Sequence, residues 1–207
     1  MGKYKILLGI VGIVLMFTQC NLNIEDDTIY IVGEGELSSY TLTNVDTFNL
    51  LTHAGLGNVN IITGESLEVE IIAQKNIFDR MQFEFENKHF RWKFGDKVII
   101  EDADSIILNI KMPNPILGIQ MIGTGNVNIS GVKQSSLYFQ LVGTGFIDCY
   151  GLELDEFEIK HQGVGDFRVW ANNEIHGEMT GIGEIYYKGD PDINVNIIGT
   201  GVIIDDN

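Results

Sequence analysis

Pairs of glycines separated by a single residue recur through the second half of this 207-residue chain. The pairs are Gly123/Gly125, Gly143/Gly145, Gly163/Gly165, Gly181/Gly183 and Gly199/Gly201, and their first glycines are 20, 20, 18 and 18 residues apart. A repeat this short cannot enclose a hydrophobic core by itself. Each copy must therefore be one layer of a stack in which neighbouring copies cover its apolar side.

Apolar and polar residues alternate on both sides of each glycine pair. Positions two and four before the first glycine, and two and four after the second, are nearly all apolar, as in Leu141, Phe139, Ile147 and Cys149. In the next copy Ile159, Phe167 and Val169 are apolar, and His161 is the exception. Extending the count to six residues before the first glycine places Leu117 and Ile193 inward as well, together with Ile197 two residues before Gly199. Alternation with period two predicts strands with one buried face, and no segment has apolar residues at helical spacing.

The predicted fold is therefore all-β. We expect residues 31–207 to form a right-handed parallel β-helix, or β-solenoid, with a glycine corner every 18–20 residues and less regular N-terminal coils. Both glycines of every pair are expected at the corner itself, because glycine tolerates positive φ and leaves room for the copies above and below. A dinucleotide-binding interpretation fails, since neither the third glycine nor the following helix is present.

An earlier pair, Gly55/Gly57, has the same signature but lies 68 residues before the next pair. Either three or four irregular coils or an inserted hairpin near residues 86–88 would fill this gap. The sequence leaves both alternatives open.

The N-terminus carries a targeting pattern. Lys3 and Lys5 precede an apolar run that ends at Phe17, and Cys20 follows. We interpret residues 1–19 as a signal peptide and residues 20–30 as an acylated cysteine with an acidic linker, which resembles a bacterial lipoprotein signal. Because Gln19 stands where such signals carry a small residue, an ordinary signal peptide is the alternative.

The chain is strongly acidic, with a formal net charge of −16 that becomes −18 once Lys3 and Lys5 are removed with the signal. Such a charge argues against nucleic acid as a partner, because a polyanion would be repelled. With only two cysteines, Cys20 and Cys149, no disulfide framework is expected.

The glycine corners resemble a known family, the auto-transporter adhesin head domain called the GIN domain. Its signature is a series of G-S-G-like corners after a Pro-containing strand end, and here Met112, Pro113 and Asn114 lead into the GTG, GTG, GVG, GIG and GTG copies. Threonine, valine or isoleucine replaces the serine that the family favours. The resemblance implies a β-solenoid lipoprotein or surface protein over about Val45 to the C-terminus, with adhesion by analogy and no catalytic residues to transfer.

Outward positions near the corners supply the candidate ligand surface. The candidates are Tyr138, Phe146, Asp148, Asp166, Arg168, Trp170, Glu184 and Tyr186. Aromatic rings on a rigid sheet suit stacking against sugars or contact with a protein. A cluster of Asp148, Asp166 and Arg168 would instead suit a polysaccharide lyase or hydrolase. A solvated rim of charged residues is the simplest alternative.

Other reactive residues fit the core better than a site. His161 falls at an inward position, and no second histidine or cysteine stands at metal-ligand spacing, so we predict no metal and no cofactor. Cys149 also points inward, which makes it a poor nucleophile.

The sequence therefore predicts a non-catalytic binding or adhesion module of a Gram-negative cell envelope. We expect an outer-membrane lipoprotein, facing the periplasm or the outside, that contacts the membrane only through its lipid anchor. A glycan or surface protein is the expected partner, and the oligomeric state is left open. A polysaccharide-acting enzyme and a purely structural envelope component are the alternatives.

Overall fold

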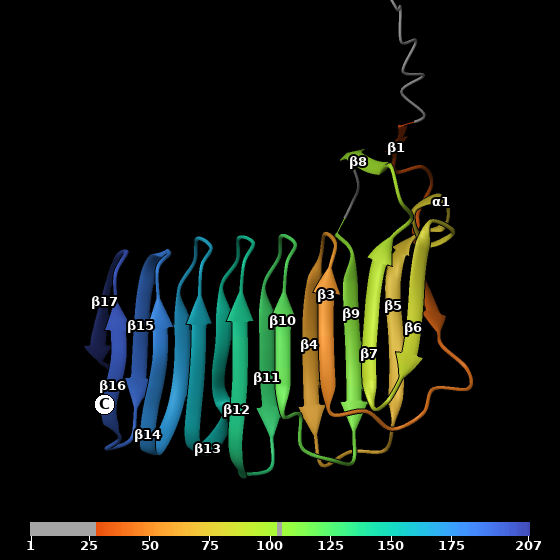
Figure 1. Cartoon of the computed structure of the whole chain (residues 1–207). Helices are drawn as coiled ribbons and strands as arrows, with labels where there is room; N and C mark the ends of the chain where they lie inside the picture. Colours follow the sequence, from red (N-terminus) through yellow and green to blue (C-terminus); the bar gives the residue numbers. More distant parts are fainter. Residues whose placement is uncertain (1–27, 103–104) are drawn as a thin grey trace, which may run out of the picture.

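The computed structural model describes residues 28–102 and 105–207, and its strands lie side by side along one long axis (Figure 1). The predicted signal peptide 1–19, Cys20 and most of the predicted linker 20–30 lie outside these residues. The first strand begins at Ile29, inside the segment predicted as linker.

The N-terminal elements are β1 (Ile29–Val32), β2 (Leu37–Thr41), β3 (Leu50–Ala54), β4 (Asn58–Thr63), β5 (Glu68–Gln74), α1 (Lys75–Phe78), β6 (Met81–Glu86), β7 (His89–Phe94) and β8 (Val98–Asp102). The elements that follow are β9 (Ile107–Met112), β10 (Gly118–Met121), β11 (Val127–Gly131), β12 (Gln134–Leu141), β13 (Ile147–His161), β14 (Phe167–Met179), β15 (Ile182–Lys188), β16 (Asp192–Ile197) and β17 (Thr200–Asp205). In the described part of the chain, α1 is the one α-helix, and no helix there has the length and apolar character to cross a membrane.

Most strands join one curled sheet with two layers. The strands on the C-terminal side of the glycine pairs form the first layer, namely β4, β11, the beginnings of β13 and β14, β15 and β17. The strands that precede the pairs form the second layer, namely β3, β10, β12, the ends of β13 and β14, and β16. Because β13 and β14 run through both layers, they close one side of the sheet.

The glycine corners lie directly on one another. Parallel bridges connect Leu56 to Thr124, Thr124 to Thr144, Thr144 to Val164 and Val164 to Ile182. A Cβ atom added at Gly143 would lie 1.7 Å from the carbonyl oxygen of Gly123. At Gly165, where φ is +153°, it would lie 1.8 Å from the carbonyl oxygen of Gly145. The corners therefore stack at a distance that leaves no room for a side chain.

The last two copies depart from the predicted corner, because their second glycines lie inside strands. Gly183 is the second residue of β15 and Gly201 is the second residue of β17, so the prediction that these two are corner residues is wrong. Ile182 pairs with Thr200 and Gly183 pairs with Gly201 in one continuous parallel ladder, which starts each strand before its second glycine. The close stacking persists, since a Cβ atom at Gly183 would lie 1.9 Å from the carbonyl oxygen of Gly165.

The hydrophobic core fills the space between the two layers. Ile147, Phe167 and Val169 from the first layer and Phe139 and Phe157 from the second are fully buried. The rings of Phe139 and Phe167 meet edge to face across the core, with centroids 5.4 Å apart. Burial of such apolar surface is the main stabilising force for a chain whose described cysteine, Cys149, is free.

The prediction of a regular right-handed parallel β-helix is wrong, although the fold is all-β apart from α1. Within the described residues the main sheet has 15 strands and forms a curled, open half-barrel of mixed strand order. Its path runs β2-β5-β9-β4-β11-β13-β12-β10-β3-β7-β6, with antiparallel pairing of β2 with β5, β5 with β9 and β6 with β7. A separate two-stranded sheet pairs β1 with β8.

The departure from a regular solenoid comes from the segment between Gly57 and Gly123. Asn87 and Lys88 have φ values of 53° and 59° and connect β6 to β7 as a hairpin, which forces antiparallel pairing. Of the two alternatives for this gap, the inserted hairpin is correct. The Gly55 corner nevertheless lies directly beside the Gly123 corner, because β3 pairs with β10 and β4 pairs with β11.

Three positions expected to point inward are exposed. Leu117 is 42% exposed because it precedes β10, in the connection from β9. Ile193 and Ile197 are 40% and 38% exposed, since β16 pairs only with β14 in the described sheet and no further layer covers it. The alternation identifies the inward face, but residues on that face become buried only where neighbouring strands cover them on both sides.

Replacing a corner glycine tests the close stacking. We expect Gly143→Ala to lower the free energy of unfolding by about 3 kcal/mol, because its Cβ would overlap the Gly123 backbone. Thr144→Ala, at the residue between the two glycines, is the matched control and should cost less than about 1 kcal/mol. Urea unfolding measures both, and equal effects would contradict the stacking argument.

A buried histidine makes stability depend on pH. His53 lies in the core beside Trp92, and burial lowers its pKa to about 4, although the backbone of Thr124 and Gly57 partly opposes the shift. The unfolded chain therefore binds a proton that the folded chain does not bind between about pH 6.5 and 4. This contribution is fully present above pH 6.5, and about 3 kcal/mol of stability is lost as the pH falls to 4.

The variant His53→Met tests this assignment, because methionine suits a column in which Met121 is the neighbouring residue. The stability advantage of the wild type over this variant should shrink by about 3 kcal/mol between pH 7 and pH 4. Leu141→Met, in the same column, should leave the pH dependence unchanged. An identical pH profile for wild type and His53→Met would contradict the assignment.

Candidate functional site

The structure brings most of the predicted surface residues together on the first layer. Asp148, Arg168, Trp170 and Tyr186 lie on β13, β14 and β15, while Phe146, Asp166 and Glu184 lie at or beside the corners of the same strands. Tyr138 is separate, because it lies on β12 in the second layer. The register pairs Asp148 with Arg168 and Arg168 with Tyr186, as the repeat spacing implies.

Arg168 is the centre of this surface. Its guanidinium carbon lies 5.1 Å from the ring centroid of Phe146 and 5.8 Å from that of Tyr150. One guanidinium nitrogen is 3.9 Å from the Asp148 carboxylate. Because Arg168 is exposed, the ion pair contributes at most about 1 kcal/mol to stability. The guanidinium is thus held between two rings while it still faces solvent.

Tyr150 completes the cluster and was not among the predicted residues. Its hydroxyl donates to Asp206 Oδ2 at 2.7 Å, and the Lys188 ammonium lies 4.5 Å from its ring centroid. Partial burial, followed by the bond to Asp206, raises the pKa of its phenol well above the usual range. An alignment of the repeats would have found this residue. The position five residues after the second glycine of a pair is occupied by Tyr150, Trp170, Lys188 and Asp206 in four successive copies.

We name this surface the Arg168 face, and it comprises Phe146, Asp148, Tyr150, Arg168, Glu184, Tyr186 and Lys188. It continues a polar column across the first layer, in which side-chain amides are hydrogen-bonded in series. Asn109 donates to Glu70 at 2.9 Å, Asn60 to Asn109 at 2.9 Å and Asn128 to Asn60 at 3.1 Å. This ladder and the parallel strands beneath it give the face a fixed geometry.

The carboxylates on the Arg168 face, and that of Asp166 beside it, are engaged in local hydrogen bonds. Asp148 Oδ1 accepts from the Tyr150 backbone nitrogen at 3.0 Å, and Asp166 Oδ1 accepts from that of Glu184 at 2.8 Å. Glu184 accepts from the Tyr186 hydroxyl, and that bond raises the pKa of Tyr186. Asp166 therefore forms a hydrogen bond at the glycine corner and does not join Asp148 and Arg168. The three residues do not form the predicted cluster of an acid pair with a basic partner.

The two remaining aromatic candidates are not part of the Arg168 face. Trp170 is 38% exposed and pairs in register with Glu153 and Lys188, further along the first layer. Tyr138 lies near Gln140, whose side-chain oxygen is 3.4 Å from the Tyr138 hydroxyl. The structure thus divides the predicted aromatic surface between two faces of the molecule.

The buried reactive residues belong to the core. Burial raises the pKa of the Cys149 thiol above its usual range, which disfavours the thiolate. His161 is buried with Nε2 2.9 Å from the Gly165 carbonyl oxygen, and burial lowers its pKa. Among the described residues, no group of three or more histidine, cysteine, aspartate or glutamate side chains could hold a metal ion.

Residues 96–191 match the family model described as "Putative auto-transporter adhesin, head GIN domain". This segment is similar to a GIN domain. The match confirms the resemblance based on the glycine corners, and it includes the Arg168 face residues from Phe146 to Lys188.

Several solved structures are similar to this chain. A putative adhesin from Bacteroides fragilis is 20% identical, with a TM-score of 0.55, over 84% of this chain and 98% of that one. A putative adhesin from Parabacteroides merdae is 17% identical, with a TM-score of 0.42, over 85% and 99% of the two chains. A putative lipid binding protein from Parabacteroides distasonis is 16% identical, with a TM-score of 0.43, over 86% and 100%. No curated protein matches the chain.

At this level of identity, the likeness to the Bacteroides fragilis protein concerns the fold alone. It agrees with a curled, open β architecture for this chain. The identity of any ligand has to be argued from the side chains of this chain.

Proposed function

We propose that this protein is a cell-envelope binding or adhesion module whose ligand-contacting surface is the Arg168 face. The observation that carries the proposal is the exposed Arg168 guanidinium held between the rings of Phe146 and Tyr150. Arginine and tyrosine are among the residues that contribute most to binding at interfaces. A glycan or a surface protein is the proposed partner, in keeping with the adhesin description of the matched family.

The contacts made by the side chains of this surface support binding over catalysis. The carboxylates of Asp148, Asp166 and Glu184 point to different local partners, so no pair of them is free to act on one bond. The rings of Phe146 and Tyr150 are fixed by contacts to Arg168 and, for Tyr150, to Asp206. Such a surface loses little conformational entropy when a ligand docks.

We further propose that the protein is exported and anchored by a lipid on Cys20, in the outer membrane of a Gram-negative bacterium. The layout of residues 1–20 supports this proposal. The anchor would leave the folded body free to display the Arg168 face to the periplasm or to the outside.

Cells that produce the full chain can test the binding surface. We expect wild-type cells to be retained on at least one member of a panel of immobilised glycans and envelope proteins. Arg168→Ala should reduce this retention about tenfold, equivalent to about 1.4 kcal/mol, because it removes the cation between the two rings. Its thermal stability should stay close to wild type, since Arg168 is exposed.

Lys160→Ala is the matched control, since Lys160 is an exposed cation on the second-layer part of β13. Its retention should equal that of the wild type. Equal losses of retention for Arg168→Ala and Lys160→Ala would show that retention depends only on net charge. That result would reject the Arg168 face as the binding surface. Retention no greater than that of cells lacking the protein would reject adhesion.

Labelling with radioactive palmitate in a Gram-negative host tests the anchor. The wild-type chain should incorporate label and partition into detergent, whereas Cys20→Ala should do neither. Cys149→Ala removes the buried cysteine and should still be labelled. Labelling of Cys20→Ala, or none in the wild type, would reject the lipid anchor.

A further inference from the structure

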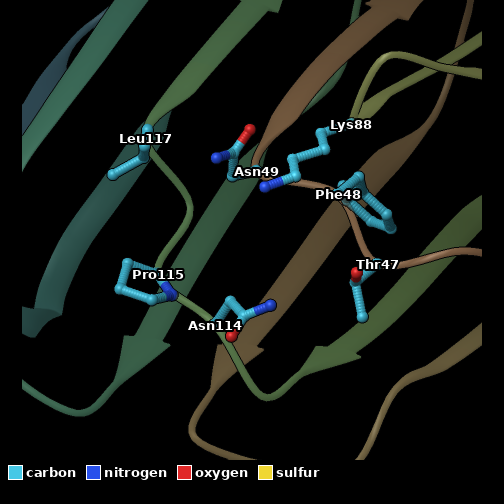
Figure 2. Close-up of a pocket in the computed structure, with 7 residues that line it drawn as sticks. All are labelled: Thr47, Phe48, Asn49, Lys88, Asn114, Pro115 and Leu117. Atoms are coloured by element: carbon cyan, nitrogen blue, oxygen red, sulfur yellow. The ribbon is translucent and has the colours of Figure 1, made fainter.

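A shallow pocket of about 290 Å³ lies at the end of the second layer, far along the chain from the Arg168 face. Three connections form it: residues 47–49 before β3, the turn of the β6–β7 hairpin, and residues 114–117 between β9 and β10 (Figure 2). None of its residues is part of the proposed adhesion surface.

The walls of this pocket are fixed by the protein itself. The Asn49 backbone nitrogen donates to the Lys88 carbonyl at 3.0 Å, and the Asn49 carbonyl accepts from the Leu117 nitrogen at 2.8 Å. Phe48 is only 2% exposed and packs against Phe90, with ring centroids 5.2 Å apart. The pocket is therefore formed before any ligand arrives, as is usual for small-molecule sites.

Lys88 occupies a backbone conformation that glycine would adopt more easily. It is the second central residue of the hairpin turn, with a φ of 59°, and a side chain in this left-handed region is strained. Its ammonium group makes no hydrogen bond or ion pair with the described part of the chain. A strained lysine whose charged group stabilises nothing in the fold points to a role in binding.

The surroundings of Lys88 suit a ligand with one negative charge. The side chain of Lys88 extends toward Asn49, and Asn114 lies on the opposite wall (Figure 2). These two amides and the Thr47 hydroxyl are neutral groups that can donate hydrogen bonds. With a net charge of −16, the protein repels multiply charged anions, whereas one lysine with neutral donors can hold a single carboxylate.

A second pocket of about 220 Å³ continues along the same strands, over residues 50–52, His89, residues 118–120 and Tyr138. Gly118 keeps it open: a Cβ atom there would lie 3.0 Å from Leu50 Cδ2 and 3.8 Å from Tyr138 Cδ1. Beside Tyr138, the Gln120 amide donates to Gln140 at 2.9 Å. An aromatic ring next to a row of amides can contact both the apolar face and the hydroxyls of a sugar.

We propose that these two pockets together bind an acidic oligosaccharide. The carboxylate of one sugar pairs with Lys88 in the first pocket, and the adjoining sugar lies over Gly118 against Tyr138 in the second. This site is independent of the Arg168 face, so either one can fail without the other.

Calorimetric titration of the full chain in detergent tests the site. The probes are sialyllactose and a hyaluronan disaccharide, each with a single carboxylate and each compared with its carboxyl-reduced form, and inorganic phosphate. At least one acidic sugar should bind ten times more tightly than its reduced form and more tightly than phosphate. Lys88→Gly should weaken that binding at least tenfold, while its melting temperature stays equal to or above that of the wild type because the turn strain is relieved.

Lys88→Arg keeps the charge and should bind within about threefold of the wild type. Arg168→Ala should bind the acidic sugar normally, which separates this site from the adhesion surface. Binding of no acidic sugar, equal binding of a sugar and its reduced form, tighter binding of phosphate, or unchanged binding by Lys88→Gly would each overturn the proposal. A clear drop in melting temperature for Lys88→Gly would assign the lysine a structural role and would also overturn it.

Discussion

The close contact between glycine corners is the constraint on which the rest of this structure depends. A side chain at Gly143 would overlap the carbonyl oxygen of Gly123, and the equivalent overlap recurs at Gly163 with Gly143. Because the corners fit only when directly stacked, they fix the register of the strands on both sides. A slip of one residue would turn every inward side chain outward. The core and the surface columns are therefore both consequences of the corner.

The fixed register also explains how a short repeat builds a composite surface. Residues 18 or 20 positions apart, such as Asp148, Arg168 and Tyr186, become neighbours on adjacent strands. Each copy contributes one side chain to a surface column, so a substitution in one copy changes one position of that column without disturbing the core. The first-layer column varies from asparagine to aspartate, arginine and tyrosine in this way, while the inward columns stay apolar.

The parts of the structure that the sequence predicts are those set by the repeat. Alternation around the corners correctly placed Ile147 and Phe167 in the core, and the repeat spacing placed Asp148 beside Arg168. The mixed sheet order was missed because the 65 residues between Gly57 and Gly123 contain no corner to set their pairing. The exposure of Ile193 was missed for a different reason: a repeat does not encode whether another layer covers it.

The candidate site was predicted only in part, for reasons that are equally physical. The contact between Tyr150 and Asp206 joins residues 56 positions apart and depends on a register shift in β13 after Cys149. The same glycine spacing also gives a bend in one copy and a strand in another, as at Gly183, because pairing with the next copy decides where the ladder starts. The Lys88 pocket is assembled from three connections that are far apart in the sequence, and no sequence pattern shows that these three connections meet.

Both proposed sites place a cation in an otherwise acidic protein, and in neither does that cation contribute much to the fold. An exposed arginine pair adds little stability, and the ammonium of Lys88 has no partner among the described residues. Their positive charges are therefore available for a ligand. Because the surrounding acidic field repels polyanions, each cation favours a partner with few charges and a large apolar or hydroxyl-bearing surface. The acidity of the chain thus excludes highly charged anions, and the two cations determine where a partner with few negative charges can bind.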